Sequence, residues 1–123
     1  MSLATAIRPV LWSGAAFNGV VALSMLFPSM FGLPAPPPGA QFNAWILAWF
    51  VVLFGAAYGW MAMQATIPRP LVALAAIGKA GVFAIALACL LRHDIGRLPF
   101  AVAAVDGLFA LAFLAWLRAT AAR

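Results

Sequence analysis

The hydrophobic residues of this chain gather into four long runs, which are separated by short segments rich in proline or charge. The runs cover about residues 10–31, 42–65, 71–91 and 100–117. A helix of about 20 apolar residues spans the hydrocarbon core of a bilayer, which is about 30 Å thick. Because a backbone inside lipid must satisfy its own hydrogen bonds, runs of this length become helices. The pattern predicts an all-α integral membrane protein with four transmembrane helices.

The breaks between the runs are short and hold helix-stopping residues. The first run ends at Pro28 or in the proline-rich segment 33–39, the second at 67–70, and the third at 92–94. Short connections make consecutive helices antiparallel neighbours, so we expect an up-down-up-down four-helix bundle. A chain of 123 residues is filled by about four such spans and their turns, which predicts a single membrane domain over residues 1–123.

Basic residues at the ends of the spans predict the orientation. One side of the membrane would hold four arginines and the other side two, namely Arg8, Arg69, Arg118 and Arg123 against Arg92 and Arg97. Since cytoplasmic loops carry the excess of Lys and Arg, both termini should be cytoplasmic. The apolar stretch after Arg8 is long for the hydrophobic region of a signal peptide, so we expect an uncleaved first span in a multi-pass protein of the cell inner membrane.

Composition agrees with lipid as the solvent and excludes several classes of function. The chain is 67% hydrophobic and 7% charged, with a mean hydropathy of +1.11, whereas soluble domains hold about 25% charged residues. The net charge is +5, but the basic residues are scattered, so we expect no nucleic-acid binding. The lone Cys89, read as a small buried apolar residue, cannot form an intramolecular disulfide. His93 and Asp94 have no second His or Cys nearby, so we expect no metal site.

Small residues recur at the spacing that lets helices approach closely in membranes. They are Gly55 and Gly59, then Ala80, Ala84 and Ala88, then Ala103 and Gly107. Contacts inside one bundle and self-association between chains both explain this spacing.

Two charged residues lie deep inside apolar runs. Lys79 is about eight residues, or about 12 Å, into the third span, and Asp106 is about eleven residues, or about 16 Å, from the end of the fourth. Either charge alone would cost about 2.5 to 3.5 kcal/mol at the centre of a membrane helix. We therefore predict that the two are paired, with Asn18 and Tyr58 at a similar depth completing a polar layer.

This layer has a structural and a functional interpretation. It is either a buried ion pair that fixes the rotation of the helices, or a site for the polar head of a hydrophobic ligand. In the second case Asn18, Tyr58, Lys79 and Asp106 would bind the ligand, and Phe109 or Phe113 would form the wall of a cavity that opens towards the cytoplasmic leaflet.

Several short motifs together resemble a known type of small bacterial membrane protein. They are Phe17-Asn18-Gly19 followed by Phe27-Pro28, Gly55-Ala56-Ala57-Tyr58, Gly78-Lys79, and Asp106-Gly107-Leu108-Phe109 with Phe113. In this respect the chain is similar to four-span proteins of the DoxX-like group, some of which are membrane subunits of quinone-linked oxidoreductases. The resemblance supports the polar residues as a set and implies no catalytic role for any of them.

The leading hypothesis is a small membrane subunit or binding protein that holds a quinone or an isoprenoid lipid. Its partners would be membrane lipid and either further copies of itself or a larger membrane complex. The alternatives are a proton-coupled small exporter, an intramembrane lipid isomerase that uses Asp106 as acid or base beside Lys79, and a purely structural accessory subunit. The exporter would be expected to need a carboxylate in the first span, where this chain has only Asn18.

Overall fold

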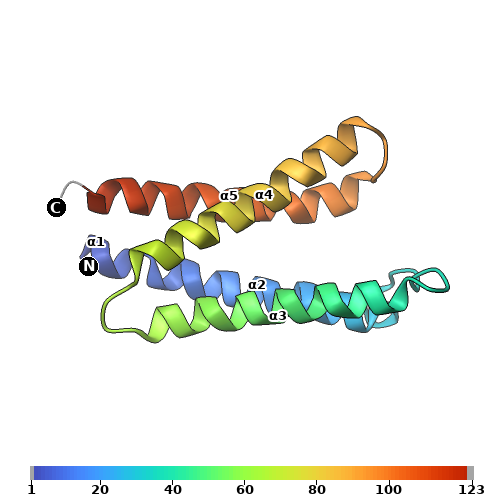
Figure 1. Ribbon diagram of the computed structural model, residues 1–123, viewed down its shortest axis with the longest axis horizontal. Helices are drawn as coiled ribbons and strands as arrows, with labels where there is room; N and C mark the ends of the chain where they lie inside the picture. The colour runs from blue at the N-terminus through green and yellow to red at the C-terminus, as the bar shows by residue number, and fades with distance from the viewer. Residues whose placement is uncertain (1, 122–123) are drawn as a thin grey trace. The chain divides into compact units, whose positions relative to one another are not determined.

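The computed structural model describes residues 2–121, which form helices joined by short connections and contain no strand (Figure 1). In chain order the elements are α1 (Leu3–Ala6), α2 (Arg8–Leu26), the 3-10 helix η1 (Pro28–Phe31), α3 (Gln41–Met63), α4 (Arg69–Leu91) and α5 (Arg97–Ala121). The chain is therefore all-α over the described residues, as predicted. The short helix α1 was not predicted.

Prolines explain most of the differences between the predicted runs and the helices. Helix α2 ends at Leu26, and the residues up to Phe31 form a separate 3-10 turn, because Pro28 cannot donate a backbone hydrogen bond and would clash with the preceding turn. Helix α5 begins at Arg97 and takes in Pro99, since the N–H groups of a first helical turn have no partner in the helix anyway. Both ends of α5 thus reach beyond the predicted 100–117.

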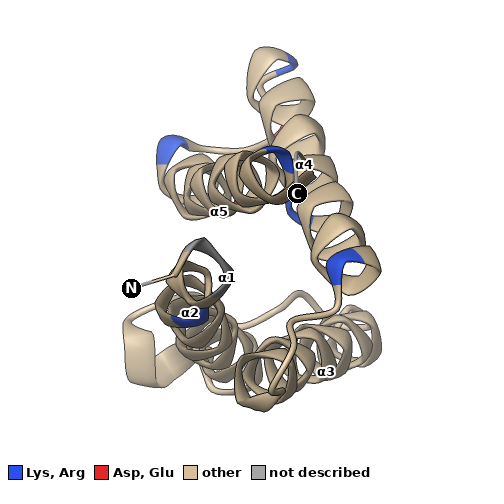
Figure 2. Ribbon diagram, turned by 90° about the vertical axis from the view of Figure 1, so that its left-hand side faces the viewer, with Lys and Arg blue, Asp and Glu red and all other residues tan. Residues whose placement is uncertain are grey.

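Four of the helices are long and apolar enough to cross a membrane. They are α2, α3, α4 and α5, with mean hydropathies of 1.4, 1.8, 2.2 and 2.1. Large apolar side chains are exposed along them, for example Trp49 (59%), Ile77 (70%) and Leu111 (65%). A soluble monomer rarely exposes so much contiguous apolar surface. In Figure 2 only short segments of the ribbon are blue, the colour of Lys and Arg. These four apolar helices indicate a multi-pass membrane protein.

The chain divides into two compact units, one made of residues 1–10 with 65–123 and the other of residues 11–64. In the first unit, α4 and α5 form an antiparallel hairpin around the turn at 92–96 (Figure 1), and α1 contacts α5. Within the same unit the Arg8 guanidinium donates a hydrogen bond of 3.0 Å to the carbonyl of Ala65. This bond ties the start of α2 to the segment that leads into α4.

In the second unit α2 and α3 approach closely at the two glycines that the sequence singled out. A Cβ at Gly55 would lie 3.1 Å from the Cβ of Asn18, and one at Gly59 would lie 3.3 Å from the ring of Trp12. The glycines are therefore used for contact between helices of one chain. Arg123, which the prediction of orientation counts, lies outside the described residues.

Candidate functional site

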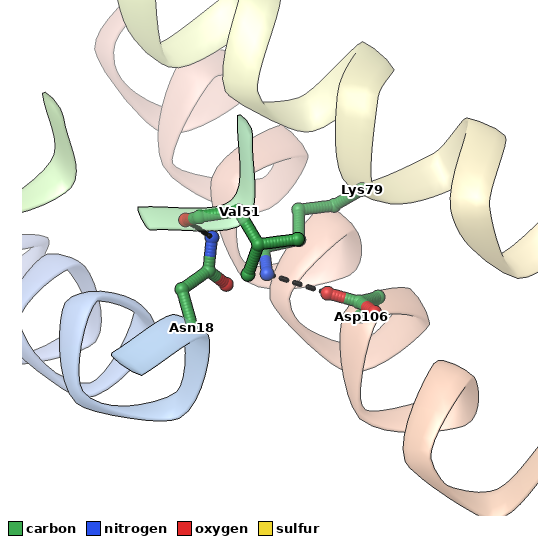
Figure 3. Close-up of polar contacts among 4 residues, drawn as sticks. All are labelled: Asn18, Val51, Lys79 and Asp106. Carbon is green, nitrogen blue, oxygen red and sulfur yellow. Dashed lines mark hydrogen bonds and ion pairs between the residues drawn. The ribbon is translucent and has the colours of Figure 1, made fainter. Parts of the chain in front are cut away.

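The two charges buried in the α4–α5 hairpin form an ion pair. Lys79 Nζ lies 2.5 Å from Asp106 Oδ1 and donates a hydrogen bond to it (Figure 3). Lys79 is 4% exposed and Asp106 9%. The predicted pairing is thus confirmed, and it lowers the penalty that each charge would carry alone in an apolar surrounding.

An aromatic ring lies beside this pair. Phe109 follows Asp106 by three residues on α5 and so lies on nearly the same face of the helix. Lys79 Nζ is 5.2 Å from the centroid of the Phe109 ring, a distance at which an ammonium group is attracted to the π face. The ring of Phe113 follows at 6.3 Å from that of Phe109. The structure thus brings together three of the five predicted site residues, namely Lys79, Asp106 and Phe109.

Helix α4 is longer than the predicted run, and this changes the position of the pair. Because α4 begins at Arg69 and ends at Leu91, Lys79 is about 15 Å from its start and about 18 Å from its end. Lys79 therefore occupies the middle of its helix, the position at which a charge is most costly on insertion scales.

Close packing of α4 on α5 holds the pair in register. Gly107, next to Asp106, faces the ring of Phe83, and a Cβ at this glycine would lie 3.1 Å from two ring carbons. The Phe83 ring also packs against Phe100, with ring centroids 6.0 Å apart. The absence of a side chain at Gly107 lets the helices approach, and the approach brings the lysine amine within reach of the carboxylate.

Asn18 and Tyr58 belong to the unit of residues 11–64. The Asn18 amide donates a hydrogen bond of 3.2 Å to the carbonyl of Val51, one turn before Gly55, whose missing side chain makes room for it. Tyr58 is buried at 3% exposure. Since these residues and the Lys79–Asp106 pair lie in different units, the convergence of all four on one polar layer stays a prediction.

The His93–Asp94 dipeptide ends helix α4. His93 has a positive φ of 61°, and the N–H groups of His93 and Asp94 donate to the carbonyls of Leu90 and Cys89 at 3.0 and 2.8 Å. These two bonds define a Schellman cap, with histidine where glycine is usual. Among the described residues no group of three or more potential ligands could hold a metal ion. Cys89, expected to be buried, is half-buried.

The opposite end of the hairpin is held by Arg69, which the sequence argument used only to count charge. Its guanidinium donates to the carbonyl of Leu117 at 3.0 Å and to the hydroxyl of Thr120, and it lies 5.8 Å from the ring centroid of Trp116. An arginine at this place ties the start of α4 to the last turns of α5, and its positive charge is favourable near the negative end of that helix dipole. In the sequence, this contact was signalled by a basic residue at the start of one helix and a tryptophan near the end of the next.

The four apolar helices thus indicate a multi-pass membrane protein, and the described part of its first unit contains a buried ion pair. No family model, no curated protein and no solved structure matches the chain. The comparisons thus lend no support to the resemblance to the DoxX-like group.

Proposed function

We propose that the chain is a small multi-pass protein of the inner membrane that binds a hydrophobic ligand such as a quinone or an isoprenoid lipid. The head of the ligand would lie at Lys79 and Asp106. The same proposal includes an up-down-up-down bundle with cytoplasmic termini. It also includes membership of the DoxX-like group, on the motifs quoted above, and either self-association or assembly into a larger membrane complex.

The observation that carries the proposal is the half-buried Phe109 ring, 5.2 Å from the amine of an ion pair in an apolar hairpin. Ligand sites are mostly apolar and contain a few convergent polar groups, often with an aromatic wall. An ammonium group can donate three hydrogen bonds and a carboxylate has two acceptor oxygens. The lysine can therefore donate to a quinone carbonyl, and the aspartate can accept from the hydroxyl of the reduced quinol.

The structural alternative rests on the 2.5 Å contact between the charges, through which each charge is neutralised without any ligand. The structural and the ligand-binding hypotheses assign different roles to the Phe109 ring. In a purely structural pair the ring only packs, so replacing it by leucine should change stability slightly and should not change ligand binding. In a ligand site, the same change removes the aromatic wall against which the head group lies.

The test measures quinone binding and folding separately in lipid nanodiscs. A ubiquinone and a menaquinone are titrated into the wild type, Lys79→Met and Phe109→Leu, with Arg92→Gln as a control that removes an exposed cation from the turn. We expect saturable binding to the wild type and to Arg92→Gln. The affinity should be at least about tenfold lower in Lys79→Met, since losing one charge-assisted hydrogen bond costs about 1.5–3 kcal/mol, and about two- to tenfold lower in Phe109→Leu, since an aromatic contact is worth about 0.5–1.5 kcal/mol. Equal affinity in the wild type and Phe109→Leu, with both folded, would overturn the proposal.

A further inference from the structure

The α4–α5 hairpin carries an apolar groove of about 520 Å³ that is separate from the ion pair. Every residue that lines it is apolar, and both helices contribute. The residues that matter below are Ala80 and Phe83 on α4, and Ala101, Ala104, Gly107 and Leu108 on α5. Ala101 and Leu108 are exposed, so the groove opens on the lipid-facing side of this unit.

The groove and the ion pair are neighbouring but separate. Phe83 and Ala110, which line the groove, lie one turn from Lys79 and Asp106, whereas other lining residues of α5 point away from Asp106. Ala104 and Leu108 are each two residues from Asp106, which corresponds to a rotation of about 200° around the helix axis. Lys79 and Asp106 do not line the groove. A molecule in the groove would therefore be distinct from the ligand proposed for the ion pair.

A positive charge lies at each end of the stripe on which the groove is built. Along α5 the stripe runs through Arg97, Ala101, Ala104 and Leu108, and spacings of four and three residues keep these positions on one helix face. At the far end it reaches Arg118. Both arginine side chains are exposed, so each can extend to the surface of the membrane.

The two halves of the stripe differ in the size of their side chains. In the half nearer Arg97 the lining on α5 is mostly small, with Ala101, Ala104 and Gly107 beside Val105. In the other half it is mostly leucine, with Leu108, Leu111 and Leu114 beside Ala110. Alanine and glycine side chains leave more room near Arg97 than the leucines leave in the other half. From Arg97 to Gly107 is about 15 Å along the helix, which is the depth of one leaflet of a hydrocarbon core of about 30 Å.

We propose that this groove binds one acyl chain of an anionic phospholipid whose phosphate is held by Arg97. The chain would lie over Ala101 and Ala104, against the Phe83 ring, and would end at the middle of the bilayer. Guanidinium groups bind phosphate through paired, charge-assisted hydrogen bonds. Arg92, at the same end of the hairpin, already pairs with Asp94 at 3.2 Å, so Arg97 is the better candidate for the phosphate.

The test is native mass spectrometry of the full chain released from nanodiscs that contain equal parts of phosphatidylglycerol and phosphatidylcholine with identical acyl chains. We expect the wild type to retain phosphatidylglycerol preferentially. Arg97→Gln should lower this preference about fivefold, the effect of one basic residue near an anionic surface. Arg118→Gln is the matched control, because it removes the same charge from the other end of the same stripe, and it should retain the wild-type preference.

A second variant tests the groove itself. Ala104→Phe fills the hollow and should reduce retention of both lipids, while Gly78→Ala, where nothing lies within 4 Å, should not. Equal losses in Arg97→Gln and Arg118→Gln would mean attraction by general surface charge, and would overturn the proposal. So would a lipid-free dimer that Ala104→Phe converts to monomer, because a second copy of the chain would then occupy the groove.

Discussion

Replacing Lys79 or Asp106 alone should destabilise the protein more than replacing both. Their atoms lie 2.5 Å apart and the residues are 4% and 9% exposed, so either change leaves one charge buried without its partner. Breaking a buried pair in this way costs about 3–5 kcal/mol, and the insertion cost of a lone charge gives a similar value of about 2.5–3.5 kcal/mol. We expect Lys79→Met and Asp106→Ala each to lower the free energy of unfolding by about 3 kcal/mol.

The double variant has no stranded charge, and a methionine in place of the lysine preserves most of the apolar contact. It should therefore lose less than either single variant, so that the two changes are strongly non-additive. The measurement is a double-mutant cycle in detergent micelles, with unfolding followed by the circular dichroism of the helices.

The exposed pair of Arg92 and Asp94 provides the matched control. Its atoms lie 3.2 Å apart, but the side chains are 78% and 52% exposed, and such pairs contribute about 0–1 kcal/mol. The cycle of Arg92→Gln and Asp94→Asn should be nearly additive. Additive losses at Lys79 and Asp106 as well would refute the reasoning, because two charges that do not depend on each other for burial cannot be a stabilising pair.

Three further predictions concern the helix contacts, the turn and the orientation. Gly107→Leu should lower the free energy of unfolding by about 1–3 kcal/mol, because it overpacks the contact between α4 and α5, whereas Gly78→Leu should be nearly neutral; thermal melts compare the two. His93→Gly should raise stability by about 0.4–1 kcal/mol, since glycine adopts the positive φ of this cap freely, and a loss instead would argue that the histidine side chain has a role of its own. Reporter fusions after Arg69 and after Arg123 should both give cytoplasmic signals, and a periplasmic signal at either site would reverse the orientation.

Much of the fold could be predicted from the sequence because lipid imposes a simple rule. A run such as 71–91 is too apolar for water and has to become a helix, and the structure has α4 at Arg69–Leu91. The ends of the helices were harder to predict. Proline stops a helix at Pro28 but is tolerated at Pro99, and only its place relative to the first turn decides which occurs.

The ion pair was predictable for the same reason, since few groups inside a membrane can neutralise a lysine. The cap at His93 and the contacts of Arg69 were not predictable, because they depend on backbone conformation and on which helix ends meet. The groove was not foreseen either. Some of its small residues were recognised in the sequence as a packing signal. The shape of the groove, however, also depends on Phe83, which packs against α5 at Gly107.

The separation of Lys79 and Asp106 along the chain has a consequence for biosynthesis. The two residues are 27 positions apart, and at a synthesis rate of about 5–20 residues per second the lysine leaves the ribosome about 1–5 s before the aspartate. During that interval α4 reaches the membrane with a charge at its centre and no partner. Its mean hydropathy of 2.2 is close to the 2.1 of α5 and above the values for α2 and α3, so its apolar residues favour insertion before the lysine is paired. The apolar residues on both sides of Lys79 thus have to favour the insertion of α4 before Asp106 has been synthesised.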